Sequence, residues 1–146
     1  MIDALKFVAT ISCTFFAGAA IYINLVEHPA RMGCGTKIAA TVWAPSYERA
    51  TVMQASLAIV GLASGCVAWL LGAGLLWLVG AILLGLVVPF TFIAIMPTNK
   101  CLLLPDRDLA SNETRALLDK WGWLHAVRSV LSLAASVVFI CALLRA

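Results

Sequence analysis

Polar and ionisable side chains recur at helical spacing in the last apolar stretch of the sequence. The four positions, at i, i+4, i+7 and i+11, are Trp121, His125, Arg128 and Ser132. This spacing places them in one stripe along a helix. In such a stripe an imidazole can exchange a proton, and a guanidinium can stabilise an anion. Because ionisable groups are costly in lipid and usually face the interior of a bundle, the stripe predicts an internal polar site.

Three further polar clusters lie at the ends of other apolar stretches. The first is Asn24, Glu27, His28 and Arg31. The second is Tyr47, Arg49, Thr51 and Gln54, and the third is Asn99 with Lys100. The members of the first cluster share one helix face only if the helix continues past Pro29, and a proline disfavours helical geometry in the residue before it.

The composition determines what kind of element positions these side chains. Of the 146 residues, 63% are hydrophobic and 12% are charged, and the mean hydropathy is +1.02. A soluble domain carries about twice this charged fraction. Four apolar stretches, at 4–26, 51–71, 75–96 and 121–144, reach the roughly 20 residues that cross a bilayer. We therefore predict an all-α membrane protein, a single domain over 1–146 that forms an antiparallel four-helix transmembrane bundle.

The connections between the stretches differ in length and charge. The link at 72–74 is short and contains two glycines, whereas 27–50 and 97–120 are long. Four spans place both termini and the short link on one side of the membrane and both long connections on the other. Most lysines and arginines belong to the long connections, so the positive-inside rule predicts that these are cytoplasmic. The net charge of +3 is small and scattered, which gives no indication of a nucleic-acid partner.

All four polar clusters lie at the end of their helices nearest the long connections. Antiparallel helices that place polar groups at one depth form a pocket, and the opposite half of the bundle is almost wholly apolar. The predicted lining residues are Glu27, His28, Tyr47, Arg49, Gln54, Asn99, Lys100, His125 and Arg128. A closed pocket favours binding or chemistry over transport. We also expect His28 and His125 to lie close enough to share a ligand, within ~8 Å, and Trp43, Trp69, Trp77 and Trp123 to lie at the membrane interfaces.

Several short motifs in this order are similar to those of a known family. They are Glu27-His28-Pro29-Ala30-Arg31, Trp43-Ala44-Pro45-Ser46-Tyr47, Met96-Pro97-Thr98-Asn99-Lys100 and Trp121-Gly122-Trp123-Leu124-His125-Ala126-Val127-Arg128. Together they resemble the anthrone-oxygenase-like family of small membrane proteins, over nearly the whole chain. In characterised members the resemblance implies oxidation of an anthrone to an anthraquinone by molecular oxygen, without a tightly bound organic cofactor.

The resemblance also implies roles for the predicted site residues, on an anthrone- or quinol-like substrate. The candidate catalytic residues are His125 or His28 as the base, Glu27 to orient an imidazole, and Arg128 to stabilise an enolate or superoxide. The candidate substrate-binding residues are Arg31, Tyr47, Arg49, Gln54, Asn99, Lys100 and Trp121.

Two alternatives keep the same architecture. His28, His125 and Glu27 are plausible ligands of a redox metal, and the two histidines could ligate a haem, although no short metal-binding spacing is present. The chain could also be a non-enzymatic accessory or ligand-binding subunit, in a homo-oligomer or a membrane complex. Glycines such as Gly61, Gly65, Gly80 and Gly85 would allow close helix contacts there.

Overall fold

The computed structural model describes residues 1–145, which form four long helical segments. The first segment consists of α1 (Ile2–Tyr22), the π-helical turn η1 (Ile23–Glu27) and α2 (His28–Gly33). The second is a single helix, α3 (Thr36–Leu70). Only Cys34 and Gly35 separate these two segments.

The third segment is broken and the fourth is continuous. The third consists of α4 (Leu75–Gly85), α5 (Val87–Phe90), the π-helical turn η2 (Thr91–Ile95) and α6 (Met96–Leu102). The fourth is α7 (Asn112–Leu144). Each of the four segments is long and apolar enough to cross a membrane, so the predicted all-α membrane bundle is confirmed.

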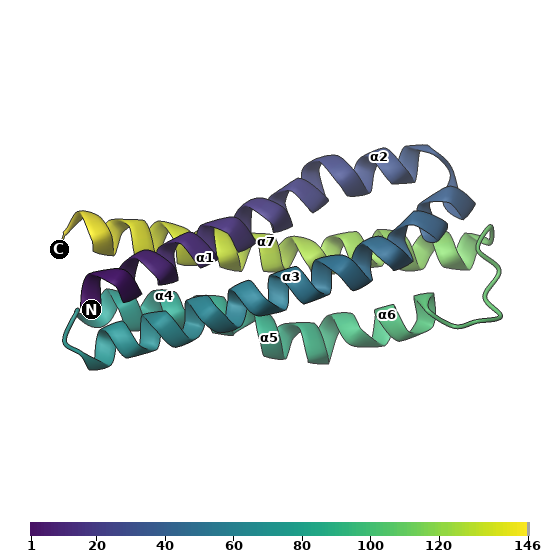
Figure 1. Cartoon of the computed structure of the whole chain (residues 1–146). Helices are drawn as coiled ribbons and strands as arrows, with labels where there is room; N and C mark the ends of the chain where they lie inside the picture. Colours follow the sequence, from purple (N-terminus) through teal and green to yellow (C-terminus); the bar gives the residue numbers. More distant parts are fainter. Residues whose placement is uncertain (146) are drawn as a thin grey trace.

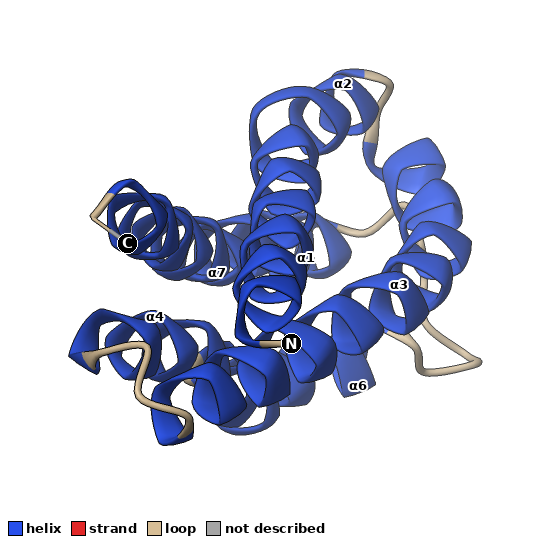
Figure 2. Ribbon diagram, turned by 60° about the vertical axis from the view of Figure 1, so that its left-hand side comes forward, coloured by secondary structure: helices blue, strands red, loops and turns tan. Residues whose placement is uncertain are grey.

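The segments form an antiparallel bundle in which α1 packs against α3 and α7, and α4 packs against the same two helices (Figure 2). Both termini and the turn at 71–74 lie at one end, and the other two connections lie at the opposite end (Figure 1). The turn requires glycine, because Gly72 and Gly74 have φ values of 90° and 103°. This placement of the termini and the connections at the two ends of the bundle agrees with the sequence prediction.

The expected long connections are mostly helical, so the four helical segments extend beyond the predicted spans. The helix continues past Pro29, which lies in the first turn of α2 directly after the π-helical turn η1. At the other connection, Ser111 caps α7 by accepting a hydrogen bond from the Thr114 amide at 3.1 Å. This cap marks the start of the last helical segment, which runs without a break from Asn112 to Leu144.

The third segment breaks next to Pro89, a proline within the apolar stretch 75–96. The ring of Pro89 displaces the carbonyl four residues earlier and cannot donate to it, and α4 ends at that residue, Gly85. In the next turn the Thr91 hydroxyl donates to the Val87 carbonyl at 2.7 Å. As a consequence the backbone of α4 packs closely on α3, whereas the backbones of α5, η2 and α6 lie farther from it and only side chains bridge the gap.

The core consists of two clusters that are separated along the bundle. One lies toward the termini and is built around Phe16, Trp77 and Phe139, and the other lies toward the long connections and is built around Trp43 and Trp121. Trp43 and Trp77 are each 1% exposed, so the interfacial position predicted for them is wrong. Both are core residues.

Trp69 and Trp123 are 38% and 80% exposed, as the prediction requires. Along α3 and α7, the polar residues Gln54, His125 and Arg128 lie between the members of the two core clusters.

Candidate functional site

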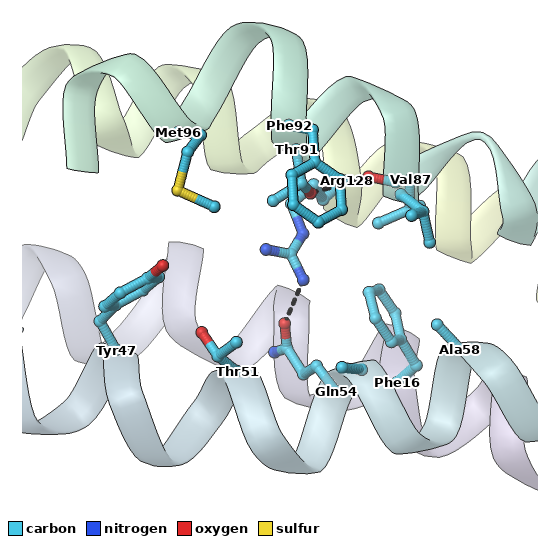
Figure 3. A pocket seen from close by; sticks show the side chains of 12 residues that line it. Phe16, Tyr47, Thr51, Gln54, Ala58, Val87, Thr91, Phe92, Met96 and Arg128 are labelled. Atoms are coloured by element: carbon cyan, nitrogen blue, oxygen red, sulfur yellow. Dashed lines mark hydrogen bonds between the residues drawn. The ribbon is translucent and has the colours of Figure 1, made fainter. Parts of the chain in front are cut away.

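A pocket of about 120 Å³ lies between α3 and the broken third segment (Figure 3). Its walls are largely apolar, and Arg128 reaches into it from α7. The lining residues are Phe16, Tyr47, Thr51, Gln54, Ala55, Ala58, Val87, Val88, Thr91, Phe92, Met96 and Arg128. Ala55 and Phe92 are exposed on the outer face of the bundle, so the mouth of the pocket opens sideways, toward the lipid of a membrane.

Arg128 is the only cation in this lining. Its Nη2 donates to Gln54 Oε1 at 2.6 Å (Figure 3), and its guanidinium lies 5.5 Å from the centre of the Phe16 ring. Among the described residues no carboxylate lies within ion-pair distance of Arg128, and Glu27 pairs with Arg31 instead. A lone arginine at the centre of a span costs roughly 2.5–3.5 kcal/mol. An anionic ligand would therefore complete this pocket.

A smaller chamber of about 20 Å³ adjoins the pocket and shares four lining residues with it, Tyr47, Thr51, Gln54 and Arg128. Its remaining lining residues are Ile23, Arg31, Ser46, Ala50, Ile95, Asn99, Trp121 and His125. The structure thus brings together seven of the predicted site residues. They are Arg31, Tyr47, Gln54, Asn99, Trp121, His125 and Arg128.

The hydrogen bonds of Asn24 fix the tautomer of His125. The Asn24 Nδ2 donates to the Gly122 carbonyl at 2.9 Å, so its Oδ1 faces His125 Nδ1 at 2.7 Å and accepts from Ser129 Oγ at 2.6 Å. Because this oxygen can only accept, Nδ1 carries the hydrogen and Nε2 keeps its lone pair. His125 is 2% exposed and lines the chamber, as a neutral base requires.

His28 lies next to this site but does not line either cavity. Its ring packs on Trp121 at 5.2 Å between centroids, and Trp121 packs on His125 at 4.8 Å. His28 Nδ1 accepts from Arg31 Nε at 3.3 Å, and the residue lines an outer groove between α2 and α7. Both imidazoles are buried, but only His125 is placed to act on a ligand in the chamber. A ligand shared by both stays a prediction.

Glu27 compensates Arg31 and orients no imidazole. Its Oε1 lies 3.3 Å from Arg31 Nη1 and accepts from Ser46 Oγ at 2.5 Å, which ties η1 to α3. Glu27 and Arg49 line an outer groove, and Lys100 is exposed, so these three predicted residues lie outside the pocket and the chamber. Within residues 1–145 no three His, Cys, Asp or Glu side chains converge as metal ligands.

Two residues that hold His125, Asn24 and Ser129, were not predicted as site residues. Helical spacing could have identified both residues. Asn24 shares a predicted helix face with Glu27, His28 and Arg31, and Ser129 follows His125 by four residues, which places it beside His125 on the helix. Phe16, Val87 and Phe92 gave no such signal, because an apolar residue that lines a pocket looks the same in sequence as one that faces lipid.

The chain is thus a helical bundle of membrane-spanning length in which an apolar pocket adjoins the Arg128 guanidinium and the buried His125 imidazole. The sequence profile of the Anthrone oxygenase family matches residues 43–138, and the chain belongs to this family. The matched range contains Tyr47, Gln54, Asn99, His125 and Arg128.

Two curated relatives agree with this assignment. The chain is 29% identical to the anthrone oxygenase tpcL of Aspergillus fumigatus over 147 residues, which cover 94% of the chain and 91% of that relative. It is 40% identical to the anthrone oxygenase gedH of Aspergillus terreus over 53 residues, which cover 35% of each protein. No solved structure matches the chain.

Proposed function

We propose that the protein is a membrane-embedded oxygenase that oxidises a hydrophobic aromatic carbon acid, of the anthrone or quinol class, with molecular oxygen. The observation that carries the proposal is the position of Arg128. Arg128 has no carboxylate partner among the described residues, and it borders both the apolar pocket and the chamber that His125 lines. An acidic C–H needs a base for its proton and a cation for the charge that develops, and both are present.

The ring system of the substrate would occupy the apolar pocket, and its acidic edge would point toward the chamber. His125 Nε2 accepts a proton from the CH₂ group, and Arg128 stabilises the negative charge of the resulting enolate. The enolate transfers one electron to O₂, and the carbon radical and superoxide join in a peroxide.

Protonated His125 returns its proton, and the peroxide loses water to give the ketone. One oxygen atom of O₂ enters the product and the other leaves as water together with both hydrogens of the CH₂ group. The enolate is itself the reductant, so the proposed reaction needs no bound organic cofactor. The family name and those of the two relatives support this choice of substrate.

The proposal is tested by measuring oxygen uptake and quinone absorbance with an anthrone and the purified protein in lipid nanodiscs. Anthrones oxidise slowly without a catalyst, so the rate without protein is subtracted. Arg128→Lys keeps the charge but loses the planar fork that holds Gln54 and an enolate oxygen together. We expect a folded protein whose rate above background falls about a hundredfold.

Arg49→Lys is the matched control, since Arg49 is exposed and lies outside the pocket and the chamber. It is expected to retain the rate of the natural protein. No acceleration of anthrone oxidation by the natural protein, or full activity of Arg128→Lys, would contradict the proposal.

A further inference from the structure

Buried polar atoms without a hydrogen-bond partner are concentrated around the small chamber. Within the described residues eight such side-chain atoms occur, and six of them belong to residues that line it. The six are Arg31 Nη1, Gln54 Nε2, Asn99 Nδ2, Asn99 Oδ1, Trp121 Nε1 and Arg128 Nε. Arg31 Nη1 makes no hydrogen bond but lies 3.3 Å from Glu27 Oε1 in an ion pair, so five of the six atoms have no polar partner of either kind. Proteins rarely leave several buried polar atoms unpaired in one place, so we expect a bound water, ion or small ligand to complete this chamber.

The chemistry of these atoms favours an anion. Five of the six are N–H donors, two of them on guanidinium groups, and Asn99 Oδ1 is the single acceptor. Donors that carry charge bind negatively charged oxygen more strongly than neutral oxygen. Glu27 is the only carboxylate paired to either guanidinium among the described residues, and it lies outside the chamber lining.

The size of the chamber excludes the aromatic part of a substrate. A volume of about 20 Å³ admits a ligand of one or two heavy atoms. The adjoining pocket of about 120 Å³ is the apolar cavity. The two cavities differ in size and polarity, and Arg128 lies in the wall of both. A large apolar ligand and a small polar ligand would therefore bind side by side, on either side of Arg128.

We infer that the chamber is a separate subsite for dioxygen and for the superoxide ion that dioxygen becomes on accepting an electron. The inference rests on the proposed function. In the electron-transfer step the enolate in the pocket loses one electron and O₂ in the chamber gains it, so negative charge moves from one side of Arg128 to the other. The donors of Asn99 and Trp121 then stabilise superoxide until it joins the carbon radical.

Asn99 is the most informative residue to change. It is 0% exposed, and both polar atoms of its side chain are free. Asn99→Leu removes a donor, and the nearly isosteric Asn99→Asp places a negative charge where an anion would bind. Thr98→Val is the matched control, because the neighbouring Thr98 also has a buried hydroxyl without a partner but does not line the chamber.

The first measurement is the dependence of anthrone oxidation on oxygen concentration in nanodiscs. We expect kcat/KM for O₂ to fall about ten- to a hundredfold in both Asn99 variants, because a hydrogen bond to a charged ligand is lost. The Kd for anthraquinone, which fills the pocket but cannot be oxidised, is expected to stay unchanged, and Thr98→Val is expected to resemble the natural protein. An unchanged kcat/KM for O₂ in the Asn99 variants would overturn the inference.

The second measurement does not depend on turnover. Chloride is a one-atom anion, and its binding broadens the chloride NMR line. We expect broadening with the natural protein and Thr98→Val, and none with Asn99→Asp. No broadening with the natural protein would overturn the anion subsite even if anthrone is oxidised. Chloride binding without anthrone oxidation would instead overturn the proposed function and the assignment of the chamber to dioxygen.

Discussion

His125 is held by an amide where many proteins use a carboxylate. Asn24 accepts from the imidazole and from Ser129 Oγ with one oxygen and donates to the Gly122 carbonyl with its nitrogen. These three bonds join the first and last spanning segments at the site. Gly122 also allows the close approach, since a Cβ there would lie 2.7 Å from His28 Nε2.

This geometry predicts the effect of changing Asn24. Asn24→Leu keeps the approximate volume but removes the acceptor of the His125 Nδ1 hydrogen, so the ring can rotate or adopt the other tautomer. We expect the rate of anthrone oxidation to fall about ten- to a hundredfold, as for other residues that orient a reacting group. Asn24→Asp retains an acceptor and is expected to keep more activity than Asn24→Leu.

The control for Asn24 is Thr10→Val, which removes a buried hydroxyl from the same helix, near the termini. Thermal unfolding of each variant separates a loss of stability from a loss of orientation. Equal activity of Asn24→Leu and the natural protein would show that the bond to His125 is not needed.

At the scale of elements, the break in the third segment opens the pocket. Pro89 made a kink predictable from the sequence, and the helix ends at Gly85 as the proline requires. The consequence was not predictable. Whether a kinked helix leans toward its neighbour or away from it depends on the side chains that it meets, and here α5, η2 and α6 lean away from α3.

A pocket that opens between two lipid-facing helices predicts that the substrate reaches it through the bilayer. Ala55 is exposed on α3 and lines the pocket. Ala55→Trp would narrow the mouth without touching His125 or Arg128. We expect kcat/KM for an anthrone delivered in lipid to fall several-fold while kcat changes little.

Ala63→Trp makes the same substitution at another exposed position of α3 that does not line the pocket. This control is expected to behave like the natural protein. If both tryptophan variants lose activity equally, the effect belongs to the membrane surface of α3, and access through this mouth is contradicted.

At the scale of the whole molecule, hydropathy predicted the number of segments, their antiparallel order and the end at which the polar groups gather. The same signal assigned Trp43 and Trp77 to the interfaces, although both are buried. In a membrane protein apolar residues face both lipid and core, so hydropathy alone cannot separate the two. For the same reason the sequence located His125 and Arg128 but not the apolar walls of their pocket.

The four-segment bundle also predicts which parts of the chain share one side of a membrane. Lys37 begins the second segment and Asp108 lies between α6 and α7, at the end of the bundle opposite the termini (Figure 1). Cysteines at these two positions, with all five native cysteines replaced by alanine, are expected to give the same response to a membrane-impermeant maleimide. A cysteine in place of Asp3 is expected to give the opposite response.

The cations at that end of the bundle predict which side of the membrane positions 37 and 108 occupy. They are Arg31, Lys37, Arg49, Lys100, Arg107, Arg115 and Lys120, against Lys6 and Arg145 near the termini. The positive-inside rule counts lysine and arginine whether or not a carboxylate pairs with them, so the ion pairs of Arg107 with Glu113 and Arg115 with Asp119 do not weaken it. Positions 37 and 108 are therefore expected to be protected in intact cells and labelled after permeabilisation. Labelling of both positions in intact cells would show that the bundle has the opposite orientation in the membrane. Opposite responses at positions 37 and 108 would contradict the prediction of four spans.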